Sequence, residues 1–136
     1  MQSREEKFKL ENHGMAVRAL KFHGGADSAG LNLISAGGDL HVFVTDVETN
    51  QRKASLVGHG DAITALAPHP TRQNVFLTAS LDKTVKVWDL SASNKEQKTI
   101  NMGSPVWGVA FSPNGEYFAA TSEDGTISLI NCKQLN

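Results

Sequence analysis

The side chains of this chain that could bind a metal ion or carry out catalysis are few and scattered. Five histidines are present: His13, His23, His41, His59 and His69. No two of them have the His-x-x-x-His spacing that brings two imidazoles to one metal ion. The single cysteine, Cys132, has no obvious base that would activate its thiol. We therefore expect no catalytic residue, no bound metal and no cofactor, and a protein that is not an enzyme.

Other polar segments have simpler interpretations. The glycine-rich stretch 23–30 lacks the lysine and the following helix of a phosphate-binding loop, so it predicts a long surface loop. His13 and His59 are expected to be structural, whereas His23 and His69 lie in turn-rich segments and are expected to be exposed to solvent.

Composition narrows the class of protein further. The formal net charge is −1, from 13 basic and 14 acidic residues, which argues against a surface that binds nucleic acid directly. A single cysteine cannot form an internal disulfide. No apolar run approaches the roughly 18–20 residues that span a bilayer, and the charged N-terminus is unlike a secretory signal. We expect a protein of the cytoplasm and/or the nucleus that does not bind membranes.

The elements that position these residues repeat along the chain. Three turn aspartates, Asp39, Asp82 and Asp124, recur at intervals of 43 and 42 residues. A period of about 40–45 residues is typical of a four-stranded propeller blade. Short alternating apolar segments such as 84–89 predict strands, glycine and proline mark the turns between them, and no amphipathic helix is predicted. The sequence therefore predicts an all-β protein.

The middle repeat resembles the WD-repeat family in its Gly-His pair at 58–59 and its Trp-Asp pair at 88–89, with a turn aspartate six residues before the tryptophan. The resemblance implies a structural chain of hydrogen bonds within the blade. Its members would be His59, Thr78 (or Ser80), Asp82 and Trp88. Such a chain would leave no buried polar group without a partner.

The flanking repeats depart from this pattern. In the first, His13, Ser35 and Asp39 match the family, but Thr45 stands where the tryptophan would be. In the third, the histidine, hydroxyl and tryptophan are replaced by Met102, Ala120 and Ile130. We therefore expect these blades to depend more on packing, and Asp124 to bind backbone N–H groups of its own turn.

The resemblance also predicts how the blades are assembled. Blades are expected over about 12–57, 58–101 and 102–132, with residues 6–11 as an extra outer strand. Because propellers have roughly 4–8 blades, these three would be part of a larger ring of six or seven. Either a homodimer of three plus three blades or a chain that supplies the remaining blades would complete it.

Within the family, the order of motifs at 13–20, 82–89, 105–109 and 130–132 is similar to the last three blades of the WD-repeat subunit of the Ski complex. This resemblance implies a non-catalytic scaffold for protein–protein interaction. The complex would be of the Ski type in RNA surveillance, or of the polymerase-associated-factor type in transcription elongation. The alternative is a self-assembling structural module that forms a symmetric ring without a dedicated peptide ligand.

The family's usual ligand surface is the top face around the channel. By resemblance it would bind peptide segments of larger subunits. The residues that map to it here are Arg18, Thr64, Leu81, Trp107 and Glu123. Trp107 and Arg18 are of the types in which interface binding energy concentrates. The competing interpretation is that Trp107 only fills a gap between blades.

Overall fold

Eleven strands and one short 3₁₀ helix make up the part of the chain that the structure describes. The computed structural model describes residues 9–11, 13–24, 30–93 and 95–135. The strands are β1 (Val17–Gly24), β2 (Leu31–Gly37), β3 (His41–Asp46), β4 (Gln51–Val57), β5 (Ile63–Pro68), β6 (Val75–Ser80), β7 (Thr84–Asp89), β8 (Glu96–Asn101), β9 (Val106–Phe111), β10 (Tyr117–Ser122) and β11 (Ile127–Asn131). The 3₁₀ helix η1 (Cys132–Leu135) follows the last strand.

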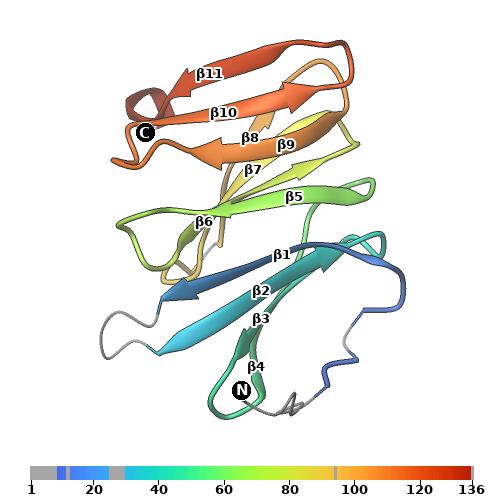
Figure 1. Cartoon of the computed structure of the whole chain (residues 1–136), viewed down its shortest axis with the longest axis vertical. Helices are drawn as coiled ribbons and strands as arrows, with labels where there is room; N and C mark the ends of the chain where they lie inside the picture. Colours follow the sequence, from blue (N-terminus) through green and yellow to red (C-terminus); the bar gives the residue numbers. More distant parts are fainter. Residues whose placement is uncertain (1–8, 12, 25–29, 94, 136) are drawn as a thin grey trace, which may run out of the picture.

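These strands form three antiparallel sheets, which we call blades 1, 2 and 3. Blade 1 has the order β1-β2-β3-β4, blade 2 the order β5-β6-β7-β8, and blade 3 pairs β9, β10 and β11. Figure 1 shows the sheets stacked face to face, with the first strands β1, β5 and β9 side by side. The predicted all-β fold of propeller blades is confirmed, and as a partial ring it has two open ends.

Half of the predicted outer strand at 6–11 lies outside the described residues. Of this segment, the structure describes Lys9, Leu10 and Glu11, and none of them belongs to a strand. In the described part of the chain, β11 is therefore paired only with β10, whereas β3 and β7 each pair on both sides. The outer strand stays a prediction, because residues 6–8 lie outside the described part of the chain.

A β-bulge recurs near the start of the first strand of each blade. In β1 and β5 the register shifts between Val17 and Ala19 and between Ile63 and Ala65. In blade 3, Ser122 pairs with Val106 and Thr121 with Gly108. One residue is thus left unpaired in each first strand: Arg18, Thr64 and Trp107. A bulge changes the direction in which a side chain points, and bulges are over-represented at sheet edges and next to active sites.

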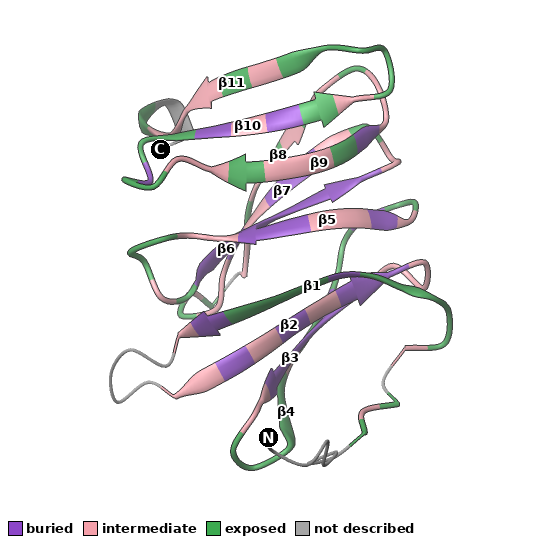
Figure 2. Ribbon diagram, in the orientation of Figure 1, coloured by how far each residue is buried: buried purple, intermediate pink, exposed green. Residues whose placement is uncertain are grey.

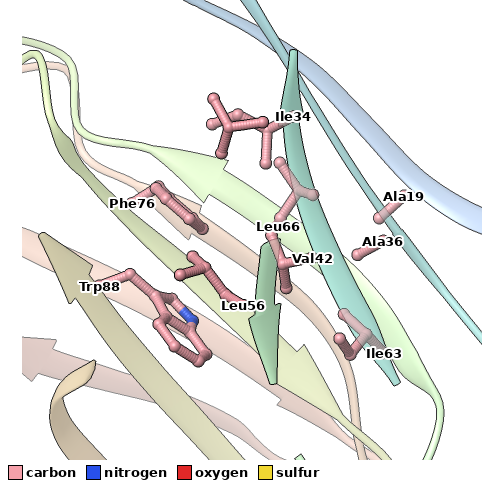
Figure 3. Close-up of a cluster of buried hydrophobic side chains, with 10 residues drawn as sticks. Ala19, Ile34, Ala36, Val42, Leu56, Ile63, Leu66, Phe76 and Trp88 are labelled. Carbon is pink, nitrogen blue, oxygen red and sulfur yellow. The ribbon is translucent and has the colours of Figure 1, made fainter. Parts of the chain in front are cut away.

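The core lies in the two seams between blades. In the seam between blades 1 and 2, Ile34 and Val42 pack against Leu66, Phe76 and Trp88 (Figure 3). The second seam joins β6 and β7 of blade 2 to blade 3, with Val106, Phe118 and Ala120 buried. Figure 2 shows buried segments concentrated on the strands that face these seams.

The two outer faces of the stack remain apolar and exposed. The free face of blade 1 carries Leu20 and Phe22, and that of blade 3 carries Ile127 and Leu129. Strand alternation places Ile127 and Leu129 at the positions that Val42 and Val44 hold in blade 1, where both valines are buried in a seam. Each free face therefore has the apolar character of a seam.

Candidate protein-interaction site

A chain of hydrogen bonds runs through blade 2 and ends at the turn between β6 and β7. Nδ1 of His59 lies 2.9 Å from Oδ2 of Asp82, and Nε2 lies 2.6 Å from the Thr78 hydroxyl. The indole N–H of Trp88 donates to the same hydroxyl at 2.8 Å. The ionised carboxylate of Asp82 can only accept, so we assign the proton of the neutral imidazole to Nδ1, which donates to Asp82. Nε2 of His59 is then an acceptor, and the Thr78 hydroxyl donates to it.

The aspartate of this chain holds its turn closed. Besides His59, Asp82 accepts from the backbone of Gly60 at 2.9 Å and from both the N–H and hydroxyl of Thr84, at 2.9 and 2.5 Å. Burial alone would raise the pKa of Asp82, but the Thr84 hydroxyl, Gly60 and His59 outweigh it and hold the pKa below its ordinary value. Thr84 was missed by the sequence analysis, although Thr126 stands at the same distance after Asp124.

Thr78 and Ser80 were both candidates for the hydroxyl of the hydrogen-bond chain, and Ser80 has a different role. The Ser80 hydroxyl lies 2.9 and 3.0 Å from the carbonyls of Asp61 and Ala62, and it accepts the N–H of Asp82. It fastens the segment before β5 to the β6–β7 turn. Thr78 alone lies between the histidine and the tryptophan.

Blade 1 keeps a shorter version of this chain of hydrogen bonds. His13 bridges Asp39, at 3.0 Å, and the Ser35 hydroxyl, at 2.9 Å. Thr45 occupies the position of Trp88, and its buried hydroxyl has no hydrogen-bond partner among the described residues. The His13 ring instead packs edge-on against Phe43, at 4.7 Å between centroids.

Of the hydrogen-bond chain seen in blade 2, blade 3 keeps only the aspartate. Asp124 accepts the N–H and the hydroxyl of Thr126, at 3.0 and 2.6 Å, which is a partner set within its own turn. Ala120 is buried, and Met102 and Ile130 pack against the second seam. Apolar packing therefore replaces the polar chain there.

The turns held by these aspartates lie beside the bulges. The residue before each turn aspartate donates its N–H to the residue before the first strand: Gly38 to Ala16 at 3.1 Å, Leu81 to Ala62 at 3.0 Å, and Glu123 to Pro105 at 2.8 Å. Each blade thus brings its bulge and its second turn to one edge. We call this the top edge; it carries Arg18, Thr64, Leu81, Trp107 and Glu123.

The five residues of the top edge differ in how far they are exposed to a binding partner. Arg18 and Glu123 are exposed, and Leu81 is partly buried. Thr64 uses its hydroxyl to bond the carbonyl of Val106 across the second seam at 2.7 Å, so it ties blades 2 and 3 together. Trp107 keeps 47% of its surface exposed and belongs to neither core cluster, whereas its neighbour Val106 is fully buried.

The expectation that His23 is exposed is wrong. His23 is 7% exposed, and its Nε2 has no hydrogen-bond partner in the described part of the chain. It is paired with Asn32 near the end of β1 rather than lying in a loop. Burial, and then the nearby His69, lower its pKa. His69 is partly buried and packs edge-on against Phe111 of blade 3 at 4.9 Å.

Two observations bear on other kinds of site. Within the described ranges, no three histidine, cysteine or carboxylate side chains gather closely enough to hold a metal ion. In the same ranges, no helical segment has the length and apolar character that crossing a membrane requires.

Stacked antiparallel sheets with adjacent first strands define the chain as part of a β-propeller. The sequence profile of the WD40 family (WD domain, G-beta repeat) matches residues 50–89 and 94–131, which together are more than half of the chain. The chain belongs to the WD40 family.

Similar proteins are considerably longer. Ribosome biogenesis protein YTM1 of Meyerozyma guilliermondii is 36% identical over 104 residues, which are 73% of this chain and 22% of that protein. Pre-mRNA-processing factor 19 of Mus musculus is 32% identical over 92 residues, 68% of this chain and 18% of that protein. A chain in the crystal structure of the Chaetomium thermophilum polycomb repressive complex 2 matches with a TM-score of 0.79 and 26% identity, covering 89% of this chain and 26% of that chain. The present chain therefore spans about a fifth of these curated relatives and a quarter of that structure.

Proposed function

We propose that this protein is a non-catalytic scaffold that binds protein partners through its top edge. The observation that carries the proposal is the repeated placement of a bulge beside an aspartate-held turn, which presents an exposed Trp107 on a rigid sheet. Tryptophan and arginine dominate the binding energy of many interfaces. The partner would be a peptide segment of a larger subunit, lying across Trp107, Arg18, Leu81 and Glu123.

The similar proteins support a role within assemblies. They include a ribosome biogenesis protein, a pre-mRNA-processing factor and a chain in the structure of polycomb repressive complex 2. We infer that the protein functions in the cytoplasm and/or the nucleus. The finer proposal is a Ski-type surveillance complex or a polymerase-associated-factor-type elongation complex, supported by the order of motifs at 13–20, 82–89 and 105–109.

The open faces of blades 1 and 3 support a second element of the proposal, completion of the ring. Further blades from a second copy or from another chain would cover Phe22 at one end and Ile127 at the other. An exposed apolar sheet face and a free strand edge favour association over a lasting open state. If the ring is itself the product, the protein is a structural module without a peptide ligand.

The top edge is tested by affinity capture with the tetratricopeptide subunit of the Ski complex as the defined partner. Trp107→Ala is expected to reduce capture at least tenfold, and Arg18→Ala several-fold. Tyr117→Ala is the matched control, because Tyr117 is an exposed aromatic residue at the opposite end of blade 3. Capture that is unchanged in Trp107→Ala would contradict a top-edge scaffold. No capture by the wild-type chain would reject the Ski-type assignment.

Light scattering separates the scaffold from the structural alternative. One chain has a mass of 14.6 kDa. A mass of two chains that persists in Trp107→Ala, with no partner captured by either protein, supports the self-assembling module. A mass of one chain, together with partner capture, supports the scaffold and leaves the remaining blades to another chain.

A further inference from the structure

A groove opens at the second seam, at the end of the strands opposite the top edge. Its volume is about 450 Å³, within the usual range of ligand pockets. We call it the bottom groove. It lies between β8 and the β5–β6 loop of blade 2 and the β9–β10 loop and η1 of blade 3. Its apolar lining residues include Val75, Leu77, Val87 and Phe111.

The groove exists because blade 3 has smaller side chains than blade 2 at matching positions. Leu90 and Cys132 are equivalent, since each donates its N–H at 2.8 Å to the residue just before the second strand, Asn74 in one blade and Glu116 in the other. Leu90 packs against the first core cluster. The Cys132 side chain has two fewer heavy atoms than leucine, and it lines the groove together with Leu77.

A second size difference lies beside the first. Trp88 pairs with Phe76, and Ile130 pairs with Phe118 at the corresponding point of blade 3. Figure 3 shows Trp88 and Phe76 filling the seam between blades 1 and 2. In the matching seam, the position equivalent to Cys132 therefore accepts a larger apolar side chain, Leu90.

Charges around the groove favour an acidic neighbour for that side chain. Three cations line it, Arg72, Lys98 and Lys133, against two carboxylates, Asp89 and Glu116. Asp89 is already bonded to the N–H and hydroxyl of Ser91, at 2.9 and 2.5 Å, and lies 3.8 Å from Arg72. The Ser91 hydroxyl holds its pKa below the ordinary value, so it is ionised and committed within the chain.

One wall of the groove is rigid. Nδ1 of His69 accepts the N–H groups of Thr71 and Arg72, at 3.1 and 2.9 Å, which closes the β5–β6 loop on itself. The same ring lies against Gly115, where a Cβ atom would approach it to 2.6 Å. A preformed wall lowers the ordering cost of binding.

We propose that the bottom groove is a second docking site, for an extended segment of a partner protein. A bulky apolar side chain of the segment fills the hollow beside Cys132, and an adjacent acidic side chain lies at Lys133. The proposal does not rest on the top edge, because the two sites lie at opposite ends of the strands and share no residue.

A displayed library of random hexapeptides, selected on the 136-residue chain, tests the groove. The expected result is enrichment of peptides with an acidic residue next to a leucine or an aromatic residue. One enriched peptide is then synthesised, and its affinity is measured by fluorescence polarisation. Failure to enrich that pattern overturns the proposal.

Four variants locate the bound peptide. Cys132→Leu copies Leu90 and fills the hollow, and Lys133→Glu reverses a rim charge; each is expected to weaken binding at least tenfold. Lys53→Glu is the matched charge control on exposed β4, and Trp107→Ala tests the top edge; both are expected to leave the affinity within twofold. Binding that Trp107→Ala removes and Cys132→Leu spares would overturn the groove as the site. Thermal unfolding midpoints within a few degrees of wild type show that each variant is folded.

The chain offers an independent readout, because Cys132 is its only cysteine. Burial raises the pKa of the thiol, so alkylation by N-ethylmaleimide is followed at about pH 8.5. The synthetic peptide at saturating concentration is expected to slow alkylation at least fivefold. An unchanged rate, with the peptide shown to be bound, overturns the proposal.

Discussion

The Thr78 hydroxyl lies 2.6 Å from Nε2 of His59, at a place where both side chains are shielded from water. This single oxygen also receives the indole N–H of Trp88. It therefore satisfies two buried nitrogen atoms that come from two different parts of the blade. A buried polar group without a partner costs about 1–3 kcal/mol, so the hydroxyl is worth more than one ordinary hydrogen bond.

Thr78→Val tests this double role. Valine keeps the shape of threonine but leaves both Nε2 of His59 and Nε1 of Trp88 without a partner. We expect the free energy of unfolding, measured by urea titration, to fall by about 3 kcal/mol. Thr78→Ser keeps the hydroxyl and should lose only about 1 kcal/mol. Equal losses for the two variants would mean that packing, rather than the hydrogen bonds, explains the effect.

The same substitution should have the opposite sign in blade 1. Thr45 stands where Trp88 stands in blade 2, and its buried hydroxyl has no partner among the described residues. Thr45→Val removes that unpaired group at almost constant volume, so we expect a gain in the free energy of unfolding of about 1 kcal/mol. Thr45→Ser is the control, because it keeps the unpaired hydroxyl and loses a methyl group. A loss of stability in Thr45→Val would show that the hydroxyl is satisfied after all.

The repeat could be predicted because its turns depend on local chemistry, whereas the polar chain of blade 2 was expected from the resemblance to the WD-repeat family. A turn aspartate needs nearby N–H donors, so Asp39, Asp82 and Asp124 mark the same turn wherever they occur. The approximate strand positions follow from alternation between those turns. The all-β blades were predictable at this level.

The details of both sites depend on strand register and on side-chain volume, which the alternation of apolar and polar residues does not determine. A bulge adds one residue to β9, which sets Trp107 apart from the buried Val106. The burial of His23 follows from its pairing with Asn32, which extends β1 farther than the turn-rich sequence suggests. The bottom groove depends on the difference in size between Leu90 and Cys132, two residues in different repeats.

Lys83 adopts a backbone conformation that suits glycine. Its φ is 76°, and the equivalent position of blade 3 is Gly125, with φ 88°. A residue with a Cβ atom pays roughly 1 kcal/mol or more in this region. We expect Lys83→Gly to raise the free energy of unfolding by about 0.5–1 kcal/mol, after the larger entropy of glycine in the unfolded chain is subtracted.

Two matched variants isolate the backbone effect at this turn. Lys83→Ala removes the same side chain but keeps Cβ, so it should give no gain. Gly125→Ala should cost about 1 kcal/mol, although a Cβ there would meet no atom within 4 Å, because only the backbone conformation is strained. Urea titrations of the three variants provide the comparison. A gain in Lys83→Ala equal to that in Lys83→Gly would assign the effect to the side chain instead.

Three histidines make the fold sensitive to mild acid. Burial is the largest cause that lowers the pKa of His23, His59 and His69. Asp82 opposes this effect at His59, and a backbone hydrogen bond with Gly115 opposes it at His69. In the unfolded chain each titrates near 6.5. As the pH falls through that value, the unfolded state binds protons that the folded state does not, so folding stability decreases. A separate loss follows below about pH 4, where carboxylates of lowered pKa such as Asp82 become protonated.

His69→Asn separates one of these contributions. The asparagine oxygen can accept the N–H groups of Thr71 and Arg72 as Nδ1 does, but it does not titrate. The variant loses the ring contact with Phe111 at every pH, so the informative quantity is the difference between the free energies of unfolding at pH 7.5 and 5.5. We expect this difference to be smaller in His69→Asn than in the wild-type chain. An identical difference would show that protonation of His69 is not coupled to the closure of the seam between blades 2 and 3, and would leave His23 and His59 as the source of the acid sensitivity.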